Sequence, residues 1–503
     1  MPVAIRSLMF GLLILALGAS PVAAEPQSAP MDNAPPPHDT AVLTITLADA
    51  VLMALENNRS LAVERLTPEI IQSFEDEARS VFDPVLSAGA ATQRVVGPRP
   101  STAEQNQVNK VDEGFIALDT YFPTGTALTL EAAAGRADAG RPDDGRYAGR
   151  LGLALNQSLL QGFGTAVNLA RLRQARLETR ISRYELQGFS EALVAGVEHA
   201  YWDYALSLRQ IEIVRESLKL AEQQLSDTRA MIAVGAMAEA ELPAVQAEVA
   251  LQRQGLIDAK NAVAANRLRL LQLVNPPGAM FDRELALSHP PAIPSVQLDP
   301  VGRSVDEGLR RRPEMNQARL EIDRGELEVV RTRNGLLPRL DLFVQLGKSG
   351  YADSFGSAFG ELDGDHYDAQ AGIRLAYPLV NRDAKARHRR ARLSREQAEK
   401  ALDNLRQVVA LDIRIAHLEV DRTREQIGAS AATRQWQEEK LRIETEKFRV
   451  GRSTNLLVAQ AQRDLLVSRI DEVRAVVAYL KALTDLYRFE GTLLERRGIG
   501  MDG

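Results

Sequence analysis

Two long stretches without proline constrain this chain more than any other feature of its sequence. No proline occurs between Pro142 and Pro243, and none follows Pro378. Proline breaks helix interiors, and both stretches consist largely of the helix formers Ala, Leu, Arg, Glu and Gln. The sequence therefore predicts two long helices, over 166–234 and 383–450. At 1.5 Å per residue each would be ~100 Å long, several times the average length.

Each long helix is expected to turn back at a glycine. Gly235 and Gly451 follow the two stretches, and a second helical stretch follows each glycine, over about 239–274 and 453–489. Glycine fits the left-handed conformation in which many helices end, so we expect two antiparallel helical hairpins. Apolar residues of the last helix recur mostly in steps of four and three, the repeat of coiled coils, at Leu466, Ile470, Val473, Val477, Leu480 and Tyr487.

The segments between the helices follow a different pattern. Residues 81–164 and 338–381 hold half of the 34 glycines, and side chains there alternate between apolar and polar or small. Alternating segments of about ten residues, with aromatic residues near their ends and polar loops, are weakly typical of outer-membrane β-barrels. A soluble all-β insertion explains the pattern equally well. The strand candidates are 84–95, 113–122, 127–133, 146–158, 340–346 and 369–377.

The chain also contains an internal duplication. Arg59 and Pro313 lie near the start of equivalent helices, Pro84 and Pro338 lie near their ends, and both pairs are 254 residues apart. Each half is therefore predicted to run as helix, strands, long helix, turn and helix. We expect a first repeat over 43–274 (strands within 84–158, hairpin 166–274), a proline-rich equatorial link over 275–300 outside the main body, a second repeat over 301–490 (strands within 339–378, hairpin 383–490) and a tail over 491–503.

The first residues are typical of a secretory signal peptide. Arg6 precedes an apolar run over 8–18, and small residues precede a cleavage site expected between Ala24 and Glu25. An apolar run of this length is short for a membrane-spanning helix, which needs ~20 residues, so a membrane anchor is the less favoured alternative. Residues 1–24 are then the signal peptide, and the proline-rich residues 25–42 are a flexible leader.

Composition argues against most enzymatic and nucleic-acid-binding functions. The chain has no cysteine, 6 histidines, no two of which lie within four residues of each other, and 61 basic against 67 acidic residues. These numbers exclude thiolate metal sites and a helical two-histidine motif, and they do not favour nucleic acid as a partner. The segment 161–164 resembles a dinucleotide-binding loop, but Val167 replaces its third glycine; a strand-to-helix corner is the simpler interpretation. We expect no catalytic, cofactor or metal site, and no enzyme.

Several segments, in this order, resemble the TolC-like outer membrane factor family, over the whole mature chain. Residues 47–58 resemble the opening helix of that family, and 197–203 resemble its first long helix. Residues 312–314 resemble the start of its second repeat, and 450–457 resemble its second periplasmic turn. No single segment is very specific, and the resemblance depends on their order, spacing and duplication.

The resemblance implies a mainly α fold with a β-barrel part. In that family four strands from each protomer of a homotrimer build a 12-stranded barrel in the outer membrane of a Gram-negative bacterium, and long helices build a hollow periplasmic tube. The implied function is a passive exit duct of a tripartite efflux or type I secretion system, with a periplasmic adaptor and an inner-membrane transporter as partners. Here the first half has four strand-like segments instead of two, so the strand number stays open. An exported structural coiled-coil protein of the periplasm or cell surface is the alternative.

The resemblance also directs attention to the hairpin tips, which in the family close or open the periplasmic entrance and contact the adaptor. Acidic residues often lie six and nine residues after the turn glycine in that family, but Leu457 and Gln460 occupy these places here, so no anionic ring is expected. We expect Arg452 to pair with Glu239 or Glu241, within a protomer or between protomers, and to hold the entrance shut. Exposed turn residues without this role are the alternative. The tip candidates are Gly235, Glu239, Glu241, Gly451, Arg452, Ser453, Asn455, Leu457 and Gln460.

Overall fold

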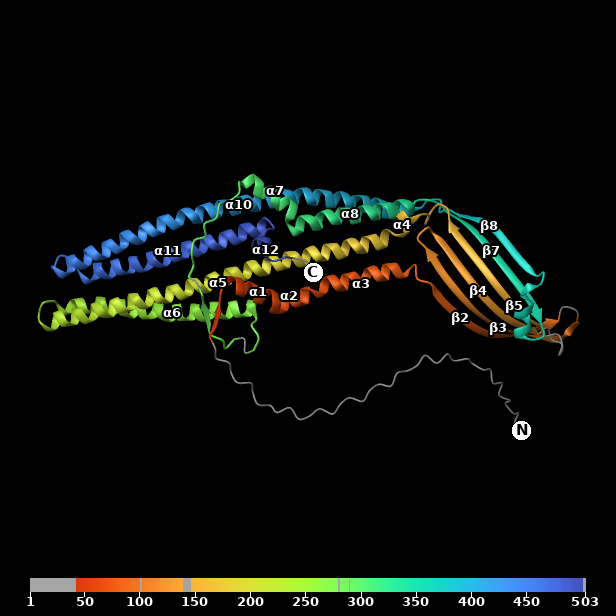
Figure 1. Cartoon of the computed structure of the whole chain (residues 1–503), viewed down its shortest axis with the longest axis horizontal. Coiled ribbons are helices and arrows are strands. Elements are labelled where there is room, and N and C mark those ends of the chain that lie inside the picture. Colours follow the sequence, from red (N-terminus) through yellow and green to blue (C-terminus); the bar gives the residue numbers. More distant parts are fainter. Residues whose placement is uncertain (1–41, 100–101, 139–145, 279–280, 289, 501–503) are drawn as a thin grey trace, which may run out of the picture. The chain divides into compact units, whose positions relative to one another are not determined.

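The computed structural model describes residues 42–99, 102–138, 146–278, 281–288 and 290–500 (Figure 1). The expected signal peptide, its cleavage site at Ala24 and Glu25, and nearly all of the expected leader lie outside these residues.

Two very long helices confirm the prediction from the proline distribution. Helix α5 (Ala170–Ala233) has 64 residues and α10 (Arg382–Arg449) has 68. Helix α5 packs antiparallel against α6 (Leu242–Val274), and α10 packs against α11 (Asn455–Phe489), so that two helical hairpins form (Figure 1). A 3-10 turn, η1 (Glu239–Glu241), precedes α6, and the short α4 (Thr165–Asn168) precedes α5.

Shorter helices extend each half toward the sheet. The first half begins with α1 (Leu47–Asn57), α2 (Arg59–Glu64) and α3 (Leu66–Ser80), and the second with α7 (Val301–Arg311) and α8 (Pro313–Asn334). Thr46 caps α1 in a reciprocal capping box with Asp49. Helix α3 packs against α5, α5 against α8, and α8 against α10. These four helices therefore form a row in which α3 and α10 are the outer members (Figure 1).

Six antiparallel strands form one sheet in the order β2-β3-β4-β5-β7-β8. All four strand-like segments of the first half belong to this sheet, so the sheet of one chain has six strands, a number that the sequence had left open. Five of the six observed strands are also longer than predicted, whereas β5 has the predicted bounds. The six strands are β2 (Val85–Arg99), β3 (Thr102–Phe122), β4 (Thr126–Asp138), β5 (Arg146–Ser158), β7 (Arg339–Ala352) and β8 (Tyr367–Ala376), with α9 (Phe355–Gly360) and the 3-10 turn η2 (Glu361–Asp363) between the last two.

Residues 285–287 of the proline-rich link contact the helices, whereas most of residues 290–300 are exposed; the expectation that the link runs outside the main body stays a prediction. Strand β6 (Leu285–Leu287) pairs in parallel with β1 (Leu43–Ile45), and the Tyr204 hydroxyl of α5 donates to the Leu285 carbonyl oxygen at 2.8 Å. A three-residue strand is too short to show alternation, so the sequence pattern could not predict this contact. The main buried cluster surrounds it, with α12 (Leu493–Arg496) at its edge, and includes Ile45, Val197, Tyr201, Leu271, Met315, Ile413, Leu486 and Leu493.

Among the described residues, no helix combines the length and the apolar character that a bilayer-crossing helix requires.

Candidate channel wall and helical-hairpin tips

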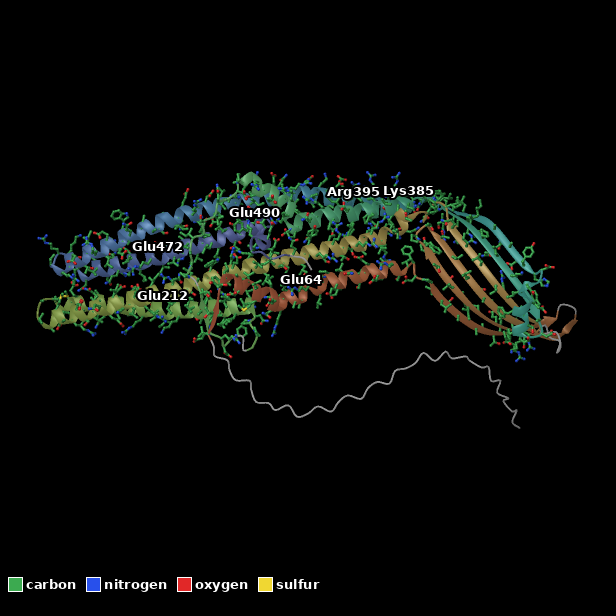
Figure 2. All side chains as sticks on the ribbon, in the orientation of Figure 1. Glu64, Glu212, Lys385, Arg395, Glu472 and Glu490 are labelled. Atoms are coloured by element: carbon green, nitrogen blue, oxygen red, sulfur yellow. The ribbon has the colours of Figure 1, made fainter. Side chains whose placement is uncertain are left out.

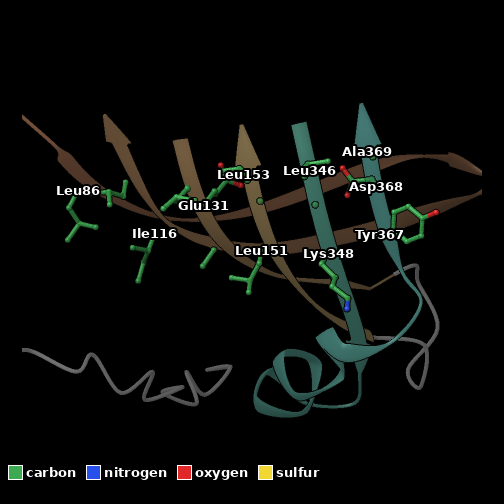
Figure 3. A pocket seen from close by; sticks show the side chains of 15 residues that line it. Leu86, Ile116, Glu131, Leu151, Leu153, Leu346, Lys348, Tyr367, Asp368 and Ala369 are labelled. Atoms are coloured by element: carbon green, nitrogen blue, oxygen red, sulfur yellow. The ribbon is translucent and has the colours of Figure 1, made fainter. Parts of the chain in front are cut away.

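One face of the sheet carries an apolar, exposed band. The strand pairing places six residues, one on each strand, in a single row across this face, and five of them are leucines. A second row beside it includes Ile116 and Leu151, and Figure 3 shows these two side chains extending to the same side as Leu86. Leu86 is 71% exposed and Ile116 is 57% exposed. The first row consists of Leu86, Leu118, Leu130, Leu153, Leu346 and Ala369.

The opposite face of the same strands is polar. Because side chains alternate along a strand, the residues next to the leucines point to this other face, and they include Asp119, Thr129, Glu131 and Asp368. The Thr129 hydroxyl donates to Asp119 at 2.6 Å, and the Arg150 guanidinium lies 2.8 Å from the Asp368 carboxylate. A sheet with one apolar exposed face and one polar face is what a barrel wall needs between lipid and an aqueous lumen.

The turn between β3 and β4 is fixed to the corner where β5 leads into the helices. The Asn168 side-chain amide donates to the carbonyl oxygens of Pro123 at 3.0 Å and Gly162 at 2.8 Å, and its oxygen accepts from the Tyr121 hydroxyl at 3.2 Å. Gly125 has a φ of 90°, and a Cβ there would lie 2.3 Å from the Gly162 carbonyl oxygen. The glycine-containing segment 161–164 is therefore a strand-to-helix corner, and its Gly162 lies directly against the β3–β4 turn.

Both helical hairpins turn through the same backbone motif. Gly235 has a φ of 71° and Gly451 a φ of 73°, which confirms the left-handed conformation expected at these glycines. In each turn the glycine N–H bonds to a carbonyl three residues earlier, and the next N–H bonds to a carbonyl five residues earlier. For the second hairpin these bonds are Gly451 N–H to Phe448 O at 3.0 Å and Arg452 N–H to Lys447 O at 2.8 Å. This Schellman arrangement satisfies carbonyls that the helix end leaves free.

Asn455 joins the two hairpin tips. Its side chain is 1% exposed, and it lies at the first position of α11. Its amide nitrogen donates to the Glu241 carboxylate at 3.1 Å, and its oxygen accepts from Gln224 at 2.9 Å and from Thr228 at 3.4 Å. Three side chains of the first hairpin thus converge on one buried amide of the second hairpin. A fourth, weaker contact runs from the amide nitrogen to the Met237 sulfur at 3.4 Å.

The remaining tip candidates do not join the hairpins. Arg452 is exposed and forms no ion pair with Glu239 or Glu241 among the described residues. A pair between protomers stays a prediction. The Schellman turn positions Arg452 at the outer end of the tip, whereas Asn455 lies between the hairpins. The Ser453 hydroxyl donates to Glu444 of its own hairpin at 2.8 Å. Leu457 and Gln460 are exposed on α11.

Sequence reasoning included Asn455 among the tip candidates but missed its burial and its partners. Gln224 and Thr228 are four residues apart on α5 and therefore share one face of that helix. Two polar side chains with this spacing, facing a helix that begins with Asn, are the signal that could have found the cluster.

A buried carboxyl group lies farther along α5. Glu191 is 3% exposed, and its carboxylate accepts from the Gln187 side-chain amide at 3.1 Å. Burial raises the pKa of Glu191 from an ordinary 4.5 to about 7, and the negative charge of Glu314 adds to this effect, whereas the Gln187 bond opposes it. The described residues contain no group of three or more His, Asp or Glu side chains that could hold a metal ion.

The comparisons with known proteins agree with this wall and these hairpins. The family model for outer membrane efflux proteins matches residues 122–276 and 305–492. A pyoverdine export outer membrane protein, OpmQ of Pseudomonas putida, is 24% identical over 318 residues, which are 62% of this chain and 64% of that protein. The chain thus spans just under two thirds of that relative. The outer membrane efflux protein BepC of Brucella suis is 24% identical over 397 residues, 77% of this chain and 81% of BepC.

A solved structure shows the same fold. The outer-membrane channel OprN superposes with a TM-score of 0.67 at 17% sequence identity, over 89% of this chain and 90% of that one. The mainly α fold class with a sheet and the expected outer-membrane location are confirmed, and the alternative of an exported structural coiled-coil protein is not supported. The matched family consists of passive outer-membrane channels and not of enzymes. Because the family model matches more than half of its residues, the chain belongs to the outer membrane efflux protein family.

Proposed function

We propose that three copies of this chain form a passive duct through which an export machine releases its cargo across the outer membrane. The observation that carries the proposal is the two-faced sheet, continuous with helices of 64 and 68 residues. The leucine row would face lipid, and the polar face with Asp119, Thr129 and Glu131 would line the lumen. The helices would extend the duct into the periplasm.

The unpaired sheet edges support assembly with further copies. Within the part of the chain that the structure describes, strands β2 and β8 each have a partner on one side only. A strand edge exposed to lipid leaves backbone N–H and C=O groups without partners, at a cost of several kcal/mol for each group. Pairing β8 of one copy with β2 of the next removes both edges, and three copies close a ring.

The outer helices of the row support the same contact. On its exposed side, α3 presents Leu66, Ile70 and Phe74 in steps of four, at 53%, 59% and 46% exposure. Exposed acidic residues flank this apolar stripe on α3. The sheet end of α10, where Figure 2 shows Lys385 and Arg395, carries many exposed basic residues. Opposite charges and an apolar stripe suit a contact between α10 of one copy and α3 of the next. The exposed charges are Glu69, Asp76 and Glu77 on α3, and Arg382, Lys385, Arg389, Arg390 and Arg392 on α10.

The hairpin tips would form the periplasmic entrance and the contact with a periplasmic adaptor, through which an inner-membrane transporter would supply the energy. The tip residues in this proposal are Glu239 and Arg452, which are exposed, and Asn455, which is buried between the hairpins. In this proposal, Asn455 holds each pair of hairpins together in the closed state. Opening would then require the loss or rearrangement of its contacts.

Three measurements test the proposal: membrane fractionation, electrophoresis and channel conductance. We expect the exported protein in the outer-membrane fraction, as a trimer in mild detergent that converts to monomer on heating. Purified trimers should insert into planar bilayers and conduct ions. A soluble periplasmic marker protein serves as the fractionation control. Recovery of the chain in the soluble periplasm as a monomer would refute both the duct and the assembly.

A further inference from the structure

We infer that the trimer closes a barrel of 18 strands, as wide as its helical tube, from three copies of the six-stranded sheet. This inference rests on the proposed trimeric duct and adds the number of strands and the width of the bore. The family resemblance implied four strands per copy and a barrel of 12 strands.

The first argument is the width of one protomer's share of the wall. Four strands lead directly into, or follow, the four helices of the row: β2 follows α3, β5 leads to α5 through α4, β7 follows α8, and β8 leads to α10. Four neighbouring helices span ~32–40 Å, whereas four tilted strands span only ~25 Å of a barrel's perimeter. Adding β3 and β4 brings the sheet to ~38 Å. The β3–β4 hairpin therefore makes the sheet as wide as the helical row.

The second argument is that this hairpin is built into the wall. Strands β3 and β4 lie between β2 and β5 and pair with them along nearly their whole lengths. Their turn is bonded to the corner through Asn168, and Thr126 bonds to Gln157 of β5. Phe82, just before β2, stacks on Tyr121 of β3 with ring centroids 6.1 Å apart. A hairpin held on both sides and at its base cannot leave the sheet without loss of these contacts.

The third argument is that the register permits closure. Following the pairs across the sheet from Val85, at the helix end of β2, leads to Gln370 on β8, which is six residues short of Ala376 at the helix end of β8. In a threefold ring the next copy's Val85 lies at the height of this copy's Val85. Val85 and Ala376 are the helix ends of β2 and β8, and placing these ends level puts the next copy's Val85 beside Ala376. The offset between Gln370 and Ala376 is six residues over six strands, so neighbouring strands are staggered by about one residue each. This stagger corresponds to a strand tilt of ~35°, at the edge of the range of known membrane barrels.

The two edges also match in direction and in face. Strands β2 and β8 run in opposite directions because every neighbouring pair in the six-stranded sheet is antiparallel. A stagger of six residues is even, so it keeps each apolar side chain on the lipid side. It brings Leu86 of one copy beside Leu375 of the next, and these side chains are 71% and 67% exposed in the single chain. The leucine band would then continue around the ring.

The bore follows from the strand number. With strands ~4.8 Å apart and tilted by ~35–40°, 18 strands give a backbone diameter of ~34–36 Å, against ~23–24 Å for 12 strands. The cross-section is thus about twice as large. The barrel is then no narrower than the tube of helices beneath it, and the hairpin tips set the size of the cargo that can pass.

Disulfide cross-linking tests the strand number directly, since the chain contains no cysteine of its own. The test variant carries Leu86→Cys on β2 and Leu375→Cys on β8. The matched control carries Leu128→Cys on β4 and Leu375→Cys, the pair that would meet if β4 were the edge strand of a 12-stranded barrel. A further variant carries Leu86→Cys and Leu118→Cys, neighbours on β2 and β3 that couple within one chain only if the β3–β4 hairpin lies in the wall. Free thiols retained by this last variant in the assembled trimer would show the hairpin outside a 12-stranded barrel and overturn the 18-stranded one. Single substitutions Leu86→Cys and Leu375→Cys serve as background. Trimer formation under reducing conditions verifies folding of every variant.

We expect Leu86→Cys with Leu375→Cys to give covalently linked trimers on a non-reducing gel, with a yield on the order of tenfold above the control, because disulfides require Cα atoms within ~7 Å. The same experiment with Ile373→Cys or Tyr377→Cys in place of Leu375→Cys tests whether the pairing of β2 with β8 between copies is shifted by two residues. Trimers that couple only through Leu128→Cys, or through none of these pairs, overturn the 18-stranded barrel but leave the duct intact. If no variant forms trimers while the parent chain is monomeric as well, the proposed function fails.

Discussion

Replacing Asn455 with alanine should open the duct by separating the two helical hairpins at their tips. Asn455 is 1% exposed, and it is the residue through which Gln224, Thr228 and Glu241 of the first hairpin contact the second. Asn455→Ala removes these hydrogen bonds without placing a new charge at the tip. Alanine keeps the helical start of α11, because Thr454 and not Asn455 caps it.

The magnitude follows from the partners that lose a bond. Neutral hydrogen bonds contribute ~1 kcal/mol and bonds to charged groups ~1.5–3 kcal/mol. Glu241 and Gln224 are half-buried and regain part of this through water, but Thr228 is fully buried and does not. We estimate a loss of ~2–4 kcal/mol per protomer. A change of 2 kcal/mol shifts a closed–open equilibrium roughly 30-fold.

Single-channel recording in planar bilayers measures the effect. We expect Asn455→Ala trimers to show a higher conductance or a larger open fraction than the parent. The increase should be similar at low and high salt, because buried hydrogen bonds are screened much less than surface charges. Ser453→Ala is the matched control, since Ser453 bonds to Glu444 within its own hairpin. Parental conductance in Asn455→Ala trimers of unchanged heat stability would refute the assignment of Asn455 as the contact that holds the tips closed.

Three further predictions concern single residues. Gly451→Val should strain the turn by ~1–2 kcal/mol, because Gly451 has a φ of 73°, and should speed hydrogen exchange at the tip without lowering barrel stability. Arg452→Glu should change conductance little at any salt concentration, since Arg452 is exposed and pairs with neither Glu239 nor Glu241; a rise confined to low salt would reveal a pair between protomers. Glu191 has a pKa of about 7 when folded against 4.5 ordinarily, so the free energy of unfolding should fall by roughly 3 kcal/mol as pH rises from about 4.5 to 7. Glu191→Gln should remove this dependence, which melting of the trimer at pH 5 and pH 8 would measure.

The long helices could be predicted from sequence because proline acts locally. Its effect on a helix does not depend on what lies nearby in space, so the absence of proline after Pro378 directly indicated α10. The positive φ of Gly451 could be predicted for the same reason. The contact that the link makes at residues 285–287 could not be predicted, because it is not local. Leu285 is held by β1 and by Tyr204, which are remote in the sequence.

At the hairpin tips, opposite charge alone does not identify the residues that join the two hairpins. Arg452 and Glu241 have opposite charges and lie at equivalent hairpin ends, so pairing them was the simplest hypothesis. The Schellman motif, however, uses the Arg452 backbone N–H to close the turn, and the Arg452 side chain is exposed. The chain then needs three more residues to start α11, and the first helical side chain, Asn455, is the one directed at the other hairpin. The turn geometry, and not the charge, selects the residue that joins the hairpins.

The strand number could not be read from alternation, because alternation identifies a strand but not its neighbours. Side chains of β3 and β4 alternate as in membrane strands, and this pattern fits a hairpin inside the sheet as well as one outside it. The deciding contacts belong to Asn168, which lies beyond β5 and shows no sequence sign of receiving the turn at Pro123. With β3 and β4 included, the sheet is about as wide as the row of four helices. A match of this kind depends on how the two layers are joined in space, so only a structure that contains both can show it.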